Sequence, residues 1–293
     1  MARKMMLIVN PYSGRGLSKS ALGTIVSGLC DSDYVVTVYF TGENTAEELA
    51  YEHAKYQELV VCVGGDGTLS SVVSGVLRCG ATAHVGYIPA GTSNDVAATL
   101  ALSKNPSVAS QMIIEGKPSP LDIGCFGGRY FTYVAAFGAF TGVAYQTPQS
   151  AKRALGHFAY VLGGLSGVGS IKARRTVVEY DGGVLEDDFI FGGVMNSTSV
   201  AGVVKLDPKR VDLSDGMFEV ILVKQPLNIA EFADILTSIV TTSYDGDNIQ
   251  MMHASEVKFS FEEEVPWTVD GEFGGNHREV SITNLREAIQ IIV

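Results

Sequence analysis

The segment from residue 59 to residue 77 constrains the fold of this chain more than any other. The apolar run Leu59–Val63 leads into Gly-Gly-Asp-Gly-Thr at positions 64–68, and the helix-like run Leu69–Leu77 follows. A buried strand, a glycine turn and a helix start place backbone N–H groups and the positive end of a helix dipole around one point, where phosphate commonly binds. Asp66 would repel phosphate unless a divalent cation or a polarised donor lay between them. A phosphate site is therefore favoured over the alternative, an ordinary tight turn in an α/β sheet.

The composition limits the class of protein. The chain has 293 residues, of which 46% are hydrophobic, and this suits two packed domains of ordinary size rather than a disordered chain. A formal charge of −11 disfavours nucleic acid as a general partner. The four cysteines show no CxxC pairing, which is typical of free thiols in a reducing compartment.

Neither a signal peptide nor a transmembrane helix is expected. The first apolar run has five residues and ends at Asn10-Pro11, which is too short for a secretory signal. Residues 130–151 are uncharged and long enough to span a bilayer, but Gly, Pro and Gln interrupt them too often for a membrane span. We therefore expect a cytoplasmic protein.

The first 120 residues alternate between strand and helix patterns. We expect strands over residues 5–9, 35–40, 59–63 and 84–88, and helices over residues 17–29, 45–55, 69–78 and 94–100. Continuously apolar strands separated by helices indicate a parallel sheet covered on both faces. Ligands of such sheets bind at the carboxyl ends of the strands, so the loops that follow them should form one rim.

The pattern changes beyond about residue 120. Gly127-Gly128-Arg129 and Asp181-Gly182-Gly183 each separate two strand-like runs, which indicates β-hairpins. One helix is expected to begin at Thr147-Pro148. The sequence thus predicts an α/β nucleotide-binding domain over residues 1–121 and a mostly antiparallel β domain over residues 122–293, whose last residues, about 284–293, can pack back on the first domain.

The two common nucleotide-binding fingerprints are absent. The chain contains no G-x-x-x-x-G-K-[ST] sequence, so it is not a P-loop NTPase. Gly14-Arg15-Gly16 lacks the third glycine of the dinucleotide motif. Phosphate must be bound in another way.

Several motifs in order along the chain carry a family resemblance. The first domain contains Asn10-Pro11-x-Ser13-Gly14, Gly64-Gly65-Asp66-Gly67-Thr68 and Pro89-x-Gly91-Thr92-x-Asn94-Asp95. The second contains Asp207-Pro208, Asp215-Gly216-x-Phe218-Glu219 and Asp270-Gly271-Glu272. Together they resemble the diacylglycerol kinase catalytic family, in particular its soluble bacterial lipid kinase branch, which is related to sphingosine kinases and more distantly to NAD kinases. One departure is Ala98, where the family usually has Arg.

The resemblance implies a β-sandwich as the second domain and an ATP site in the cleft between the domains. It implies that ATP and its phosphates contact Asn10, Pro11, Ser13, Gly14, Thr41, Gly64, Gly65, Asp66, Gly67, Thr68, Thr92 and Asn94. Asp66 would act near the metal–phosphate centre. Each threonine taken singly could instead be a helix cap, and so could Asn94 and Asp95.

A second metal site is expected in the acidic loop of the β domain. Asp212 and Asp215 flank a glycine turn, and oxygen-rich loops of this kind suit Mg²⁺. In the soluble bacterial branch this position resembles a structural Mg²⁺ site, here framed by Asp212, Asp215 and the backbone at Met217. The alternative is an ordinary Asp-Gly turn between strands.

Phosphorylation of an alcohol benefits from a carboxylate within hydrogen-bond reach of the attacking hydroxyl. The resemblance assigns this base to Asp270-Gly271-Glu272. We expect Asp270 to be the base with Glu272 almost equally favoured, since alternate strand positions share a face.

Basic side chains gather around the helix expected after residue 147. They are Lys152, Arg153, His157, Lys172, Arg174 and Arg175. A solvated face is the ordinary interpretation, and contact with anionic lipid headgroups is the alternative.

The sequence as a whole predicts an ATP- and Mg²⁺-dependent kinase that phosphorylates diacylglycerol or a similar lipid to give phosphatidic acid, working peripherally at the inner face of the membrane. A kinase of a soluble substrate, like the NAD kinases, and a non-catalytic nucleotide- or lipid-binding regulator are the alternatives. The lipid is not identified, and a homodimer is among the oligomeric states left open.

Overall fold

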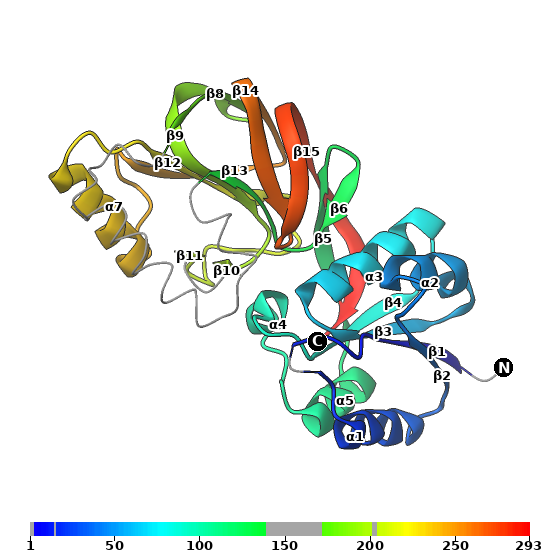
Figure 1. Cartoon of the computed structure of the whole chain (residues 1–293). Helices are drawn as coiled ribbons and strands as arrows, with labels where there is room; N and C mark the ends of the chain where they lie inside the picture. Colours follow the sequence, from blue (N-terminus) through cyan, green and yellow to red (C-terminus); the bar gives the residue numbers. More distant parts are fainter. Residues whose placement is uncertain (1–2, 15, 139–171, 201–203) are drawn as a thin grey trace. The chain divides into compact units, whose positions relative to one another are not determined.

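The chain divides into two compact units. The computed structural model describes residues 3–14, 16–138, 172–200 and 204–293 (Figure 1). The first unit comprises Met1–Ile123 together with Arg286–Val293, and the second comprises Gly124–Leu285. Two strands, β5 (Pro118–Phe126) and β15 (Glu272–Ile292), run through both.

The first unit is built on a parallel sheet with strand order β4-β3-β1-β2. The strands are β1 (Arg3–Val9), β2 (Tyr34–Phe40), β3 (Leu59–Gly64) and β4 (His84–Pro89), and all three pairings between them are parallel. The C-terminal end of β15 adds a further parallel partner through Ile291, which pairs with Val85. β1 and β3 are buried over most of their length, which explains why they lack the alternation of a half-exposed strand.

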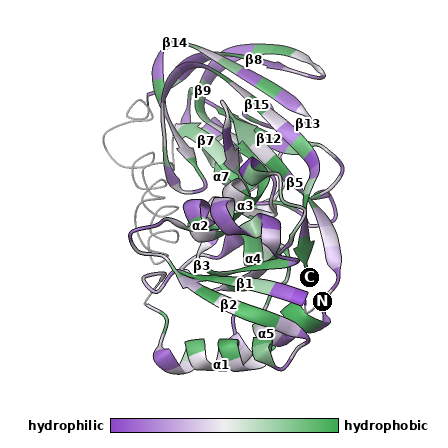
Figure 2. Ribbon diagram, turned by 90° about the vertical axis from the view of Figure 1, so that its right-hand side faces the viewer, coloured by the Kyte–Doolittle hydropathy of each residue, from purple (hydrophilic) through white to green (hydrophobic). Residues whose placement is uncertain are grey.

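Local sequence signals set the ends of the helices around this sheet. The helices are α1 (Lys19–Cys30), α2 (Ala46–His53), α3 (Asp66–Cys79), α4 (Asp95–Thr99) and α5 (Pro106–Glu115), with a short 3₁₀ turn at Ala54–Tyr56. Thr45 and Glu48 form a reciprocal capping box on α2, and α3 ends at Gly80 in the left-handed conformation. Buried residues of α1 and α5 form one hydrophobic cluster with residues of β1, β3 and β4. Figure 2 shows β1 and β3 as hydrophobic over most of their length.

Helix α5 was not predicted, although its start carries two clear signals. The Asn105 side chain accepts hydrogen bonds from the backbone N–H groups of Ser107 and Val108, and Pro106 occupies the first helical position. Both features favour a helix N-terminus.

The second unit is a set of mostly antiparallel strands. Its order is β13-β12-β9-β7-β14-β15, with β8 paired to both β9 and β14 and β6 paired to β5. These strands are β6 (Arg129–Phe131), β7 (Val134–Gly138), β8 (Arg174–Tyr180), β9 (Gly183–Met195), β12 (Phe218–Lys224), β13 (Ile249–Ala254) and β14 (Glu256–Val269), with the short pair β10 (Ser199–Val200) and β11 (Val204–Lys205). The hairpins expected at residues 127–129 and 181–183 join β5 to β6 and β8 to β9.

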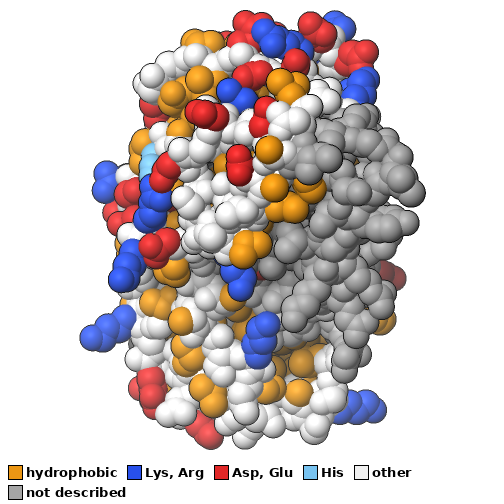
Figure 3. Space-filling view, turned by 90° about the vertical axis from the view of Figure 1, so that its left-hand side faces the viewer, with side chains coloured by type: hydrophobic (Ala, Val, Ile, Leu, Met, Phe, Trp, Pro, Cys, Tyr) orange, Lys and Arg blue, Asp and Glu red, His pale blue; other side chains and the backbone are white. Residues whose placement is uncertain are grey.

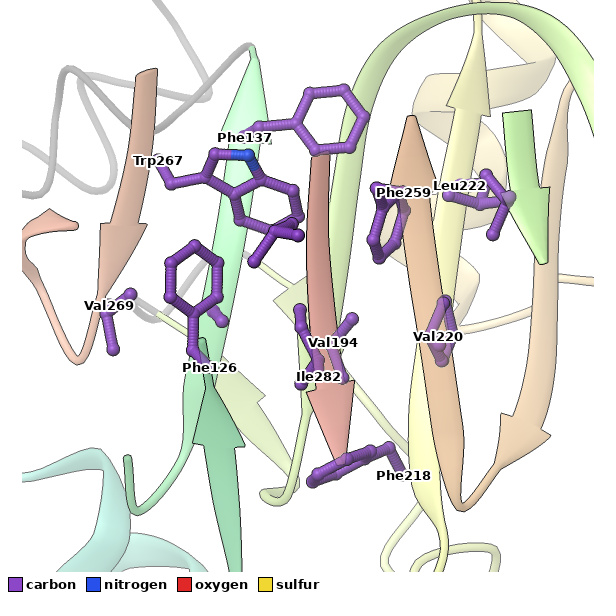
Figure 4. Close-up of a cluster of buried hydrophobic side chains, with 14 of the residues drawn as sticks. Phe126, Phe137, Val194, Phe218, Val220, Leu222, Phe259, Trp267, Val269 and Ile282 are labelled. Carbon is purple, nitrogen blue, oxygen red and sulfur yellow. The ribbon is translucent and has the colours of Figure 1, made fainter. Parts of the chain in front are cut away.

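The core of this unit is rich in aromatic rings. Trp267 lies within 5.1 Å, centroid to centroid, of Phe126, Phe137 and Phe259 (Figure 4). Tilted and edge-to-face contacts of this kind add to the stabilisation from burial alone. The core holds the strands that lead into the β14–β15 turn, where the expected base lies.

Strand β13 and helix α7 (Ile229–Thr241) were not predicted. The helix expected from Thr147 lies outside the described residues. No helix in the described part of the chain is long and apolar enough to cross a membrane.

The four cysteines are free thiols, as predicted. Cys62 lies within β3, and burial, reinforced by the nearby Asp66 charge, raises the pKa of its thiol. A thiol that stays protonated is a poor nucleophile, so Cys62 serves packing.

Candidate active site

Loops that follow three strands of the first unit meet at the carboxyl ends of those strands. The backbone N–H of Asn10, just after β1, donates to the carbonyl of Val63 at 2.9 Å. The N–H of Ala90, just after β4, donates to the carbonyl of Gly64 at 2.7 Å. The N–H of Thr41, after β2, donates to the carbonyl of Val9 at 2.9 Å. The rim expected from the sequence is therefore formed within this unit.

Glycine permits the close approach of these loops. A Cβ atom placed on Gly91 would lie 2.5 Å from the Cα of Gly65, closer than real Cβ contacts come, so the two loops pack backbone against backbone. Gly14 has a φ of +63°, and a Cβ there would meet the carbonyl oxygen of Ala90 at 2.6 Å. These positions require glycine for space and, at Gly14, also for conformation.

Asp66 is a buried carboxylate that caps a second helix. It is the first residue of α3, and its two oxygens accept the backbone N–H groups of Asp95 at 2.9 Å and Val96 at 3.1 Å, at the start of α4. The hydroxyl of Tyr87 also approaches, at 3.4 Å. A buried charge needs such partners, and the N-termini of two helices favour a negative one. Asp66 therefore ties the 64–68 loop to the 89–95 loop.

The N-terminus of α3 supplies backbone donors. Gly65 is its N-cap and provides no side-chain hydrogen bond. Thr68, in the first turn, is buried, and its hydroxyl accepts a hydrogen bond from the Asn10 side-chain amide at 3.1 Å. A helix start without a side-chain cap is suited to an anion.

The other expected nucleotide contacts divide into two groups. Asn94, at a φ of 56°, uses its side chain within its own loop: it accepts from the Gly91 N–H and donates to the Gly91 carbonyl, both at 2.9 Å. Ser13 is also buried. By contrast, Pro11, Gly14, Thr41, Gly67 and Thr92 keep part of their surface exposed on the rim.

In the second unit, Asp270 is deeply integrated into the fold. One carboxylate oxygen accepts from the N–H of Thr132 at 2.7 Å and from its hydroxyl at 2.9 Å. The other accepts from the N–H groups of Tyr133 at 3.0 Å and Val134 at 3.1 Å. The side chain is buried, so it fixes residues 132–134 as their hydrogen-bond acceptor.

Glu272 lies in a different environment, which corrects the expectation that the two acids share a face. Val269 pairs with Glu272, so Asp270 and Gly271 form a two-residue turn, with φ of 47° and 80°. Two left-handed residues are typical of a type I′ hairpin, and the strand alternation does not continue through it. The side chain of Glu272 is 64% exposed, and Arg129 donates to one of its oxygens at 2.7 Å.

Asp270→Ala is expected to destabilise the second unit. The substitution leaves three buried backbone N–H groups without their acceptor and places alanine at a positive φ, so we expect the free energy of unfolding to fall by about 3 kcal/mol or more. Thermal or urea unfolding measures this. The matched change Glu272→Ala should leave the unfolding midpoint nearly unchanged, and equal losses in the two variants would contradict the distinction.

The expected metal loop is present as a pair of turns. The Asp212 Oδ1 atom accepts from the N–H and the hydroxyl of Ser214, both at 3.0 Å, and the Asp215 Oδ1 atom accepts from the N–H of Met217 at 2.8 Å. Both carboxylates are exposed. No group of three or more His, Cys, Asp or Glu side chains in the described residues is placed to hold a metal, so any cation here would also need backbone or water oxygens.

Two residues near these sites were missed by the sequence analysis. Tyr87 lies in an apolar strand, where only its hydroxyl distinguishes it, and that hydroxyl reaches Asp66 and Asn94. Arg129 follows the glycine pair of a hairpin and was interpreted only as part of the turn. The Asp-Gly pair at 270–271 is a strong hairpin signal that could have placed Glu272 directly after a turn, whereas its contact with Arg129 has no local signal.

The chain is similar to proteins of known family over almost its whole length. Residues 4–126 match the model of the diacylglycerol kinase catalytic domain, and residues 135–293 match that of the YegS C-terminal NAD kinase beta sandwich-like domain. The chain is 32% identical to a diacylglycerol kinase of Bacillus subtilis, with 93% of this chain and 91% of the relative covered. It is 33% identical to one of Staphylococcus carnosus, with 99% and 95% covered.

Solved structures show the same fold. A Bacillus anthracis structure matches with a TM-score of 0.85 at 24% identity, covering 99% of this chain and 96% of the other. A second structure, of a diacylglycerol kinase from the same organism, matches with a TM-score of 0.75 at 22% identity and the same coverage. With the sequence matches above, these findings show that the chain belongs to the diacylglycerol kinase family.

Proposed function

We propose that this protein is an ATP-dependent lipid kinase that transfers the γ-phosphoryl group to a hydroxyl of diacylglycerol or a similar lipid, giving phosphatidic acid. The observation that carries the proposal is the near full-length similarity to proteins named diacylglycerol kinase. The rim of the first unit supports it, because the unit has an uncapped helix N-terminus and glycine-permitted loop contacts where phosphates would bind.

The residues of the first unit would position ATP. Backbone N–H groups of Gly64–Thr68 would hold phosphate oxygens, and Thr41 and Thr92 would contact the nucleotide. Asp66 and Asn94 fix the shape of this rim through their loop hydrogen bonds. Mg²⁺, when bound with ATP near Asp66, would neutralise charge on the phosphates.

Glu272 is proposed as the general base in preference to Asp270. The Asp270 carboxylate already accepts four hydrogen bonds, whereas Glu272 is exposed and one of its oxygens, Oε1, accepts none from the described residues. Glu272 would take the proton of the lipid hydroxyl while the hydroxyl oxygen attacks the γ-phosphorus. The bond between the γ-phosphorus and the β-phosphate oxygen would break, and ADP would leave. The proposed reaction would thus use ATP bound to the first unit and a base supplied by the second.

The two alternative functions have less support. The description of the C-terminal domain family mentions NAD kinase, whereas the two relatives that match almost the full length of the chain are named diacylglycerol kinase. A non-catalytic regulator would be favoured only if the Ala98 departure signalled lost catalysis. Ala98 lies on the exposed side of the short helix α4, and Asp66 and Glu272 are both present.

A transfer assay tests the function directly. Purified protein with radiolabelled ATP and Mg²⁺ should label diacylglycerol in mixed micelles more than a sphingoid base, a monoacylglycerol or NAD. Labelling of NAD alone would support the soluble-substrate alternative, and ATP binding without transfer to any acceptor would support the regulator.

The proposed Mg²⁺ site at Asp212, Asp215 and Met217 can be tested by stability. Oxygen donors in an exposed acidic turn suit Mg²⁺, and a cation that binds only the folded state at 100 times its Kd stabilises by about 2.7 kcal/mol. We expect Mg²⁺ to raise the Tm of the wild type and not that of Asp215→Ala. Asp234→Ala, an exposed acid on α7, is the control and should respond like the wild type. An identical response of all three proteins would rule out the site.

Peripheral contact with a membrane is proposed because the substrate is insoluble. Lys152, Arg153 and His157 of the expected basic group lie outside the described residues. Lys172 and Arg174 both pair with Glu263, at 2.7 and 3.3 Å, and Lys172 holds the pKa of the Glu263 carboxyl below its usual range. Basic and acidic side chains are also interspersed on the part of the face that Figure 3 shows in colour.

The negative charge of Glu263 offsets part of the attraction of Lys172 and Arg174 for an anionic surface. Each cation near such a surface contributes about 1 kcal/mol, and salt screens that contribution. We expect activity on vesicles to rise with anionic lipid and to fall with added salt. Glu263→Gln, which removes the paired charge, should steepen both dependences without changing activity on a soluble short-chain diacylglycerol. Vesicle rates that ignore lipid charge and salt would contradict electrostatic contact.

A further inference from the structure

Arg129 connects two turns of the second unit. It is the first residue of β6 and pairs with Phe126 in the β5–β6 hairpin, so its backbone position is fixed by the ladder. Its guanidinium donates through Nη2 to the Glu272 carboxylate at 2.7 Å and through Nη1 to the carbonyl of Phe273 at 3.2 Å. Two donors therefore bind two consecutive residues at the start of β15.

The same turn is held a second time, from the other end of the β6–β7 segment. The N–H of Asp270 donates to the carbonyl of Val134 at 2.8 Å, and the Asp270 carboxylate accepts the N–H groups of residues 132–134. The backbone on both sides of Glu272 is thus fixed to residues 129–134. Only the Glu272 side chain would be able to rotate, and Arg129 restrains it.

The pairing leaves one oxygen of the carboxylate available to a substrate hydroxyl. Arg129 occupies the Oε2 atom, while the Oε1 atom makes no hydrogen bond within the described residues. A general base requires one oxygen directed at the hydroxyl it deprotonates. The ion pair between Arg129 and Glu272 is exposed, and exposed pairs contribute little to folding stability.

We propose that Arg129 is a positioning residue that holds the Glu272 carboxylate in the orientation required for deprotonation of the lipid hydroxyl. The inference rests on the proposed function, because it assumes that Glu272 is the base. The planar guanidinium presents two donor nitrogens in a fixed fork, whereas a lysine at this position has one nitrogen on a flexible stem. The proposal therefore predicts a dependence on the shape of the side chain as well as on its charge.

Arg129→Met is expected to lower kcat by about 10- to 100-fold, the range that misplacement of a catalytic group by about 1 Å produces. The KM for ATP and the Tm should stay within error of the wild type. Arg129→Lys should recover part of the lost kcat. The assay uses the full chain and a soluble short-chain diacylglycerol, and Arg3→Met, which breaks a similarly exposed pair with Glu58, should keep the wild-type kcat.

A double mutant shows whether Arg129 acts through Glu272. In the Glu272→Gln background, Arg129→Met should cause little further loss, because the group it positions is already gone. A full additional loss in that background would mean that Arg129 acts independently and would overturn the proposal. A fall in Tm that accounts for the lost activity would overturn it as well.

The outcomes also separate this inference from the proposed function. If the wild type labels no lipid, the proposed function fails before any variant is made. If Glu272→Gln keeps the wild-type rate, the base assignment fails, and the positioning role fails with it. If Glu272→Gln is impaired and Arg129→Met is not, the function stands and only the inference is wrong.

Discussion

Glu272→Gln is expected to lower kcat for lipid phosphorylation by about 10²- to 10⁴-fold, the contribution typical of a general base. Glutamine keeps the size of the side chain but cannot accept the hydroxyl proton. Because Glu272 is exposed and makes one ion pair, the Tm should change little. Steady-state kinetics with a soluble diacylglycerol and thermal unfolding measure the two effects in one preparation.

The matched control is Glu279→Gln. Glu279 lies on the same strand, is similarly exposed and pairs with Lys258, so its substitution removes a comparable ion pair away from the turn. It should retain wild-type kcat. A near-wild-type rate in Glu272→Gln would instead return the assignment to Asp270 or to a mechanism that needs no protein base.

Asp66→Asn is expected to lower kcat by at least about 100-fold and to lower the Tm by several degrees. Loss of the negative charge weakens the proposed metal–phosphate centre. Asn also presents one amide oxygen where the carboxylate accepted two backbone N–H groups, and a hydrogen bond to a charged group contributes about 1.5–3 kcal/mol. Kinetics at a temperature well below both melting points, together with calorimetry, separate the chemical effect from the structural one.

Asn105→Ala provides the control for the structural effect. Asn105 caps α5 by accepting two backbone N–H groups, much as Asp66 caps α4, and it carries no charge. Its loss should cost about 1 kcal/mol of stability and leave kcat unchanged. If Asp66→Asn shows only a comparable loss of stability with normal turnover, Asp66 is a structural cap and takes no part in catalysis.

Much of the first unit was predictable because its signals are local. The apolar run at 59–63, the glycines after it and the helix pattern that follows each depend on neighbouring residues, and the structure has β3 and α3 there. The cap pairs of α2 are similarly local. Helix α5 was not predicted, although the sequence contains the signal for its start at Asn105-Pro106.

The motifs of the family also lay in the sequence, and so did the identity of the acids at 66, 270 and 272. What the sequence did not determine was the surroundings of each acid. Asp66 is bound by the N–H groups of Asp95 and Val96, about 30 positions further along the chain, and burial between two helix starts depends on how the loops pack.

The choice between Asp270 and Glu272 shows this limit most clearly. Two acids separated by one residue would share a face in a regular strand, and the sequence alone favoured that geometry. The tertiary structure places a two-residue turn with positive φ at Asp270 and Gly271, which directs Asp270 to the N–H groups of residues 132–134 and leaves Glu272 exposed beside Arg129. The sequence by itself determined which acids are available and the family to which they belong. Only the tertiary structure decided which acid is satisfied within the fold and which can accept a proton, because hydrogen bonds between segments more than 130 residues apart have no local signal.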